Sequence, residues 1–234
     1  MKRVVLALLT LLLLATAIAG FTPSGRLKTV AVRFVARNPW LSRVVFNRAF
    51  KTSRVPQVHN SFLEEAVRGV EPGKALDVTM GNGRNAVFLS RQGWDVTGFD
   101  VSEEALARAR DSAQQAQVDI HAVQSTSEGF DYGIDRWDLI VLAYAWAPVS
   151  DRAFAARLRS SLKRGGLVVF EHFLHAGPNP VPKEAGAPDP GELPKLFGGF
   201  EILRYDELTG VADWEPPVGG RMSRQLVRMV ARKD

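Results

Sequence analysis

From about residue 61 onward, apolar runs that favour strands alternate with longer runs that favour helices. Ser61 and Glu64 fit a capping box, and Ser102 fits a helix cap followed by acidic residues. Strands alternating with helices of this length predict an α/β fold, a parallel sheet with helices on both faces. The expected strands cover residues 74–79, 94–100, 118–124, 137–145, 167–174, 201–208 and 224–233, and the expected helices cover residues 61–69, 84–93, 102–117 and 151–166.

One edge of this sheet is the predicted ligand site. In doubly wound sheets, ligands bind beyond the carboxyl ends of the strands, near the point where strand order switches. Five segments that are far apart in the chain would therefore meet there. They are residues 77–83, Asp100, the segment after Gln124, residues 143–146 and residues 171–175.

The stretch "LDVTMGNGRNA", residues 76–86, limits the kind of ligand. Its glycines, Gly81 and Gly83, match the dinucleotide fingerprint G-x-G-x-x-A, which on its own is a weak signal. Asp77 ends the preceding strand, where a carboxylate would repel a pyrophosphate but could pair with a cationic group. Asp100 ends the next strand and suits a ribose diol, because a carboxylate accepts from both hydroxyls. The residues therefore favour a ligand with a ribose and a positive charge, and without phosphate.

The segment "LDVTMGNGRNAVFLSRQGWDVTGFDVS", with "WDLIVLAY" and "LKRGGLVVFEHF" further along, resembles class I S-adenosylmethionine-dependent methyltransferases. The similarity is greatest to their small-molecule, tellurite-resistance-like branch and covers roughly residues 60–234. It implies a Rossmann-like, seven-stranded, mostly parallel sheet with an antiparallel last strand. It also implies S-adenosyl-L-methionine as cofactor, with Asp77 near its amino group, Gly81 and Gly83 beneath it and Asp100 at its ribose.

Two positions depart from the family pattern. Thr79 stands where the family usually has glycine, so its side chain could crowd the cofactor or bond the carboxylate end. Thr126 stands where an acid often contacts the adenine amine, and Ser127 or Glu128 could substitute. The residues expected to bind the cofactor are Asp77, Thr79, Gly81, Gly83, Asn85, Asp100, Val101, Ser127 and Ala143.

Methyl transfer depends on position and desolvation more than on a fixed triad, so the catalytic candidates are groups at the rim. Tyr144 could bound the transfer channel, with core packing as the alternative. Glu171 and His172 could take a proton from a hydroxyl or thiol acceptor, with a structural hydrogen bond as the alternative. The candidates for acceptor contact are Trp146, Arg84 and His59, for which core packing, a rim ion pair and a linker position are the alternatives.

Metal chemistry is not expected. The chain has no cysteine, and its four histidines lack metal-binding spacing. Two other functions stay open beside a methyltransferase. A non-catalytic S-adenosylmethionine-binding module is suggested by Thr79 and Thr126, and a nicotinamide-dependent oxidoreductase by the glycine spacing alone.

Residues 1–20 are predicted to be a hydrophobic signal or anchor segment, since an apolar run follows Lys2 and Arg3. Ala17-Ile18-Ala19 also fits a cleavage site, so export after cleavage and a retained membrane anchor both stay open. The basic, amphipathic residues 21–56 favour an anchor with the domain, residues 57–234, facing the cytoplasm. S-adenosylmethionine is made inside cells, which also favours a domain on the cytoplasmic side over an exported one. The basic segment suits a membrane surface, or alternatively packs on the domain as an ordinary helix.

Charge is distributed unevenly along the chain. Residues 1–60 hold ten Lys/Arg and no Asp/Glu, whereas residues 61–234 hold twenty Lys/Arg and twenty-five Asp/Glu. A nucleic-acid site should place its cations on the folded domain, so nucleic acid is not expected as a partner. We expect a small-molecule acceptor, and the oligomeric state stays open.

Overall fold

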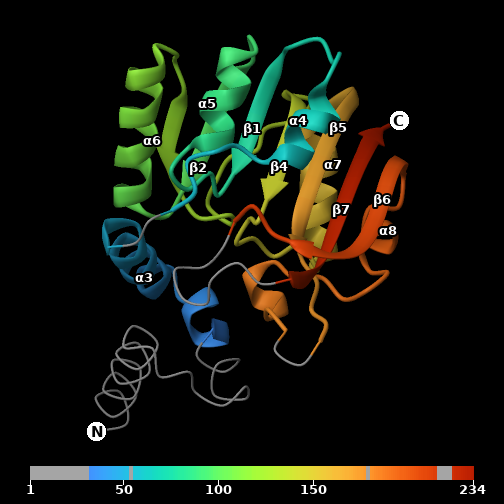
Figure 1. Ribbon diagram of the computed structural model, residues 1–234. Helices are drawn as coiled ribbons and strands as arrows, with labels where there is room; N and C mark the ends of the chain where they lie inside the picture. Colours follow the sequence, from blue (N-terminus) through green and yellow to red (C-terminus); the bar gives the residue numbers. More distant parts are fainter. Residues whose placement is uncertain (1–31, 53–54, 178–179, 215–222) are drawn as a thin grey trace, which may run out of the picture.

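The computed structural model, which describes residues 32–52, 55–177, 180–214 and 223–234, has a single seven-stranded sheet whose central strands are rich in buried Val, Leu, Ile and Phe (Figure 1). The strand order is β3-β2-β1-β4-β5-β7-β6. The first five strands in the chain pair in parallel, and β7 is antiparallel to both of its neighbours. The strands are β1 (Lys74–Val78), β2 (Asp95–Asp100), β3 (His121–Gln124), β4 (Trp137–Ala143), β5 (Leu162–Phe173), β6 (Phe200–Val211) and β7 (Ser223–Lys233). The predicted fold class and its antiparallel last strand are confirmed.

Helices cover both faces of the sheet (Figure 1). Phe62, Leu89 and Leu106, from three helices, pack in one core on one face. Phe154 and Leu193, from two others, pack in a second core on the opposite face. The helices are α3 (Pro39–Thr52), α4 (Ser61–Val67), α5 (Arg84–Arg91), α6 (Glu103–Ala116), α7 (Arg152–Ser161) and α8 (Leu193–Leu196), with a 3₁₀ turn η1 (Lys183–Ala185).

The central strands are buried on both sides, and alternate residues feed the two cores. In β4, Leu139 and Val141 belong to the core with α4, α5 and α6, whereas Ile140 and Leu142 belong to the core with α7 and α8. This is the two-residue period expected of a strand sandwiched between helix layers. Strand order switches at β1, which pairs with β2 on one side and β4 on the other.

Two predicted helix boundaries are wrong. The cap of α4 is Asn60, whose side-chain oxygen accepts from Leu63 N, and Ser61 is the first helical residue. The helix expected over residues 151–166 ends at Ser161, because Leu162 is fully buried and pairs with Trp137 as the start of β5. Burial of that leucine in the sheet outweighs the helical propensity of "LKR".

The amphipathic helix α3 packs on the domain, which is the alternative that the sequence left open. Its contacts are chiefly with α6. Ser42 and Phe50 are buried on one side, while Arg43 and Arg48 are exposed on the other. Among the described residues, no helix has both the length and the apolar character needed to cross a membrane. The predicted signal or anchor, residues 1–20, lies outside the described residues.

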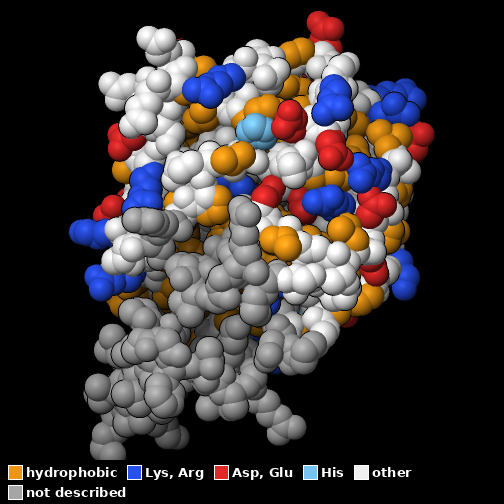
Figure 2. Space-filling view, in the orientation of Figure 1, with side chains coloured by type: hydrophobic (Ala, Val, Ile, Leu, Met, Phe, Trp, Pro, Cys, Tyr) orange, Lys and Arg blue, Asp and Glu red, His pale blue; other side chains and the backbone are white. Residues whose placement is uncertain are grey.

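Charged side chains of both signs are interspersed over the face of the described residues shown in Figure 2. His59 Nε2 lies 2.9 Å from Glu64 Oε2.

Candidate functional site

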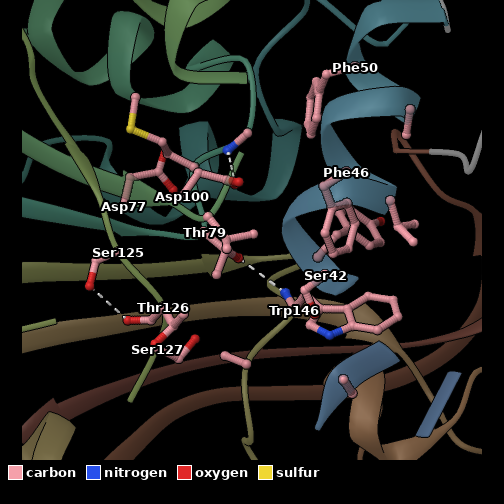
Figure 3. Close-up of a pocket in the computed structure, with 18 of the residues that line it drawn as sticks. Ser42, Phe46, Phe50, Asp77, Thr79, Asp100, Ser125, Thr126, Ser127 and Trp146 are labelled. Carbon is pink, nitrogen blue, oxygen red and sulfur yellow. Dashed lines mark hydrogen bonds between the residues drawn. The ribbon is translucent and has the colours of Figure 1, made fainter. Parts of the chain in front are cut away.

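A cavity of about 730 Å³ lies at the switch point, beyond the carboxyl ends of β1, β2 and β4. Its size is that of a small-molecule site. Strand-end carboxylates lie on one side of it, and side chains of α3 lie opposite (Figure 3). The site is therefore enclosed partly by the helix that precedes the sheet in the chain.

Asp77, at the end of β1, is almost fully buried in the wall of this cavity. One carboxylate oxygen accepts a hydrogen bond from the backbone of Ala86, at the start of α5, whereas Oδ2 has no hydrogen-bond partner within the described parts of the chain. Burial raises the pKa of Asp77 to about 7, although the Arg84 guanidinium acts in the opposite direction. A buried carboxylate with a vacant oxygen is suited to a cationic donor such as an ammonium group.

Asp100, at the end of β2, holds in place the turn that contains Gly81 and Gly83, which we call the glycine turn. Its Oδ2 accepts from Gly81 N at 3.0 Å, and its Oδ1 accepts from Ser102 N at 2.9 Å. Burial raises the pKa of Asp100 to about 6, and the backbone donors partly offset this rise. Gly81 has φ +56, and a Cβ there would lie 3.1 Å from Phe50 Cζ. The turn therefore needs glycine at residue 81 both for its backbone conformation and for the close approach of Phe50 from α3.

Thr79 lines the cavity in a conformation that favours glycine, with φ +51. This explains why a glycine is usual at the position in the family pattern. Its hydroxyl is not vacant here, because Thr79 Oγ1 accepts from Trp146 N at 3.1 Å. The side chain thus ties the end of β1 to the segment after β4, at a backbone cost of about 1–2 kcal/mol.

Most of the predicted site residues line this cavity together. Those that do are Asp77, Thr79, Gly81, Arg84, Asn85, Asp100, Val101, Ser127, Ala143, Tyr144 and Trp146. Four predicted residues are not part of its lining: Gly83, His59, Glu171 and His172. Their surroundings explain why.

Gly83 and His59 have packing roles. A Cβ on Gly83 would lie 2.7 Å from Ala109 Cβ, so this glycine allows α5 and α6 to pack closely. The ring of His59 stacks on Phe88 at a centroid distance of 4.0 Å and contacts Glu64. Neither residue reaches the cavity wall.

Glu171, at the end of β5, is at the centre of a buried network and is 1% exposed. Its carboxylate accepts from Asn60 Nδ2 at 2.6 Å, from the Tyr144 hydroxyl at 3.0 Å, and from Nε and Nη2 of Arg228, both at 3.1 Å. Burial and the neighbouring Glu171 raise the pKa of Tyr144 far above its ordinary value. The phenol therefore stays protonated, and Glu171 fixes its orientation from behind the cavity wall.

His172 faces away from the cavity, toward the loop that follows β5. Burial lowers the pKa of His172 to about 4, and its Nδ1 lies 3.2 Å from the carbonyl oxygen of Phe173. A Cβ on Gly186 would lie 3.3 Å from its Nε2. The imidazole is neutral near pH 7 and is enclosed by backbone.

Arg84, at the start of α5, forms an ion pair at the cavity wall. Its Nη2 lies 3.0 Å from Asp213 Oδ1, and its Nη1 donates to the carbonyl oxygen of Val58 at 2.8 Å. This is the rim ion pair considered from the sequence. Trp214, next to its partner, also lines the cavity and stacks on Tyr144 with ring centroids 6.1 Å apart.

The sequence prediction missed the roof of the site. Side chains of α3 at the spacing of one helix face line the cavity: Ser42, Val45, Phe46, Ala49 and Phe50. Their periodicity is visible in the sequence, but an apolar helix face does not by itself identify what it covers. Among the described residues, no group of three or more His, Asp and Glu could hold a metal ion.

Residues 75–166 match a protein family described as "Methyltransferase domain". The chain is 25% identical over 197 residues to "Probable S-adenosyl-L-methionine-dependent methyltransferase TehB" from Haemophilus influenzae, which covers 80% of this chain and 65% of the relative. It is 27% identical over 182 residues to "Hemagglutinin 1" from Eikenella corrodens, which covers 74% of this chain and 59% of that protein. The chain thus spans less than two thirds of the length of these relatives.

A solved structure of TehB from Haemophilus influenzae has the same fold. It superposes with a TM-score of 0.63 at 21% identity, covering 82% of this chain and 67% of that chain.

Proposed function

Because this chain belongs to the class I S-adenosylmethionine-dependent methyltransferases, in their tellurite-resistance-like branch, we propose that it transfers a methyl group from that cofactor to a small-molecule acceptor. The observation that carries the proposal is the vacant, buried Oδ2 of Asp77 beside the turn held by Asp100. S-adenosylmethionine has an ammonium group and a ribose diol, which match these two carboxylates in kind.

The residues of the cavity fit the cofactor. Asp77 would bind its amino group, Asp100 its ribose, and Gly81 would let the backbone approach it closely. Ser127, which is buried in the wall at the end of β3, would border the adenine side. When bound, the cofactor supplies a methyl group on a positively charged sulfur, which is an electrophile that needs no metal.

The other residues would position the acceptor and exclude water. Tyr144 lines the cavity with its hydroxyl committed to Glu171, so it acts as a fixed wall. We assign Glu171 a positioning role, since its carboxylate is already occupied by three neighbouring side chains. The acceptor's proton, where it has one, would leave to water.

Calorimetric titration of the whole chain tests this function. We expect S-adenosylmethionine and S-adenosylhomocysteine to bind with micromolar dissociation constants and NADH to bind at least tenfold more weakly. Preferential binding of NADH would instead support an oxidoreductase. Binding of both sulfur compounds without release of S-adenosylhomocysteine on any acceptor would indicate a non-catalytic binding module.

We also propose that residues 1–20 are retained as a membrane anchor, with the domain on the cytoplasmic side. The Lys/Arg excess after the apolar run supports this orientation. So do the exposed cations Arg48 and Lys51 of α3, which suit an anionic membrane surface. After expression in a bacterial host, the chain should stay in carbonate-washed membranes with its full mass. A chain that begins at Gly20 and is found outside the cell would contradict the proposal.

A further inference from the structure

The roof helix α3 spans two parts of the cavity that differ in chemistry (Figure 3). Phe50 lies over the glycine turn, with its ring close to Gly81. One turn earlier, Phe46 packs edge-on against Trp146, with ring centroids 5.1 Å apart and planes at 78°. The carboxylates that suit the cofactor are at the first part, so the second part, after β4, remains for the acceptor.

The wall of this second part is apolar. It includes Val45, Phe46, Trp146 and Pro148. Ser42 also lines it, but its hydroxyl donates to the carbonyl oxygen of Val35 at 2.8 Å and is therefore occupied. An acceptor that binds here would exchange water for aromatic and aliphatic carbon.

The charged side chains near this second part do not provide an unpaired, buried counter-ion for a charged acceptor. Glu184, from the loop after β5, lines the cavity, but its carboxylate is paired with Arg33 Nε at 2.6 Å. Arg37 also lines the cavity and is exposed at its edge. A charged acceptor would thus lose hydration without gaining an unpaired buried counter-ion among the described residues.

One polar atom of this wall lacks a partner. Trp146 Nε1 is buried and makes no hydrogen bond within the described ranges, the same condition as Asp77 Oδ2 at the other end. An unpartnered buried donor costs about 1–3 kcal/mol. Because the N–H is shielded from water, a ligand atom that reaches it would have to displace part of the wall. The indole N–H is therefore a closed part of the wall, and the ring of Trp146 is the part that an acceptor can contact.

We propose that the acceptor is a planar, uncharged aromatic molecule that packs against the cavity side of the Phe46–Trp146 pair. This rests on the proposed function, and it assigns Phe46 and Trp146 as the residues that select the acceptor. Two neighbouring aromatic side chains in the wall favour a ring over an aliphatic chain, because offset or edge-on ring contacts add about 0.5–1.5 kcal/mol beyond area burial.

The roof is held in place by contacts next to the cofactor carboxylate. Ser102 Oγ donates to Asn47 Oδ1 at 2.7 Å, and Arg43 pairs with Glu103 at 2.9 Å. Ser102 lies two residues after Asp100, so the helix that bears Phe46 is fixed to the same end of β2 that would bind the ribose. These contacts therefore fix the position of the acceptor part of the cavity relative to the cofactor part.

The test is calorimetric titration of the whole chain loaded with S-adenosylhomocysteine. The probes are 2-naphthol and naphthalene-2-thiol, and the comparison ligands are 2-mercaptoethanol and sodium selenite. We expect at least one aromatic probe to bind at least tenfold more tightly than either comparison ligand. Phe46→Ala and Trp146→Phe should each weaken that probe about 5- to 10-fold, because each removes aromatic surface from the cavity wall.

Val44→Ala is the matched control, since Val44 is on the exposed side of the same helix. Val44→Ala should leave the affinities for the aromatic probe and for S-adenosylhomocysteine unchanged. All variants should keep S-adenosylhomocysteine affinity within about twofold of wild type. Aromatic probes that bind no better than selenite, or that bind Phe46→Ala and Trp146→Phe unchanged, overturn the inference while the proposed function stands. A wild-type chain that fails to bind S-adenosylhomocysteine overturns both.

Discussion

Asp77→Asn is expected to weaken S-adenosylmethionine binding by about 100-fold at pH 8, because the amide cannot neutralise a buried ammonium group. Asparagine keeps the shape of the side chain, so the sheet and the glycine turn should persist. The dissociation constant measured by calorimetry checks this. Asp95→Asn, at the exposed opposite end of β2, is the matched control and should bind as wild type does.

The pH dependence of the same titration gives a second readout. Burial raises the pKa of Asp77 to about 7, so the carboxyl becomes neutral as the pH falls below 7 and its attraction for a cation is lost. Wild-type affinity should therefore fall between pH 8 and pH 6, while the affinity of Asp77→Asn changes much less. A flat wild-type profile, or equal affinity in the two proteins at pH 8, would contradict this assignment.

The effect on stability has the opposite sign. A carboxyl whose pKa is about 7 when folded and 3.8 when unfolded destabilises the folded chain as pH rises from about 4 to 7. Without ligand, Asp77→Asn should thus be more stable than wild type at pH 8, by on the order of 1–4 kcal/mol. The two proteins should differ little near pH 4.

Glu171→Ala is expected to lower the free energy of unfolding by about 3–5 kcal/mol, measured by urea denaturation. The change leaves Arg228 without its buried partner and removes the hydrogen-bond acceptor of Asn60 and of the Tyr144 hydroxyl. Glu201→Ala is the control, because Glu201 forms an exposed pair with Arg232, and its loss should cost less than about 1 kcal/mol.

Glu171→Gln separates a positioning role from proton transfer. It keeps two polar atoms in the network, so it should recover part of the stability and retain turnover with an altered KM. If Glu171 instead accepts a proton from the acceptor, Glu171→Gln would lose turnover although it recovers the same part of the stability. Its pH–rate profile would then lose a titrating group.

The fold and the meeting of Asp77, Gly81 and Asp100 at one cavity could be predicted from the sequence because both depend on local signals. Asp77 and Asp100 directly follow buried strands, and parallel strands bring their carboxyl ends to one edge. The two glycines of the turn, Gly81 and Gly83, are separated by one residue and closely follow a strand, which few other local structures require. Such features are fixed within a window of about ten residues, and the structure confirms the strand pattern that they predicted.

The remaining features depend on partners that are distant in the chain. The sequence places Glu171 at a strand end but cannot show that Arg228 lies opposite it on β7, as the antiparallel register does. The face of α3 could equally have packed on a membrane, since periodicity identifies an apolar side and not its neighbour. Asn60 and Ser61 are both good caps, and contacts with Glu171 and Asp213 favour Asn60.

The position of α3 bears on how this domain can be shortened or recombined. Residues 39–52 precede the sheet, yet they supply the cover of the cavity and are joined to α6 through Asn47. A chain trimmed to residues 57–234 would keep every strand and both cofactor carboxylates, but Trp146 and the glycine turn would be open to solvent. Conversely, exchanging this one helix between relatives would alter the cover without touching the sheet. The cover of the cavity and the sheet that forms its floor are thus separate parts of one chain.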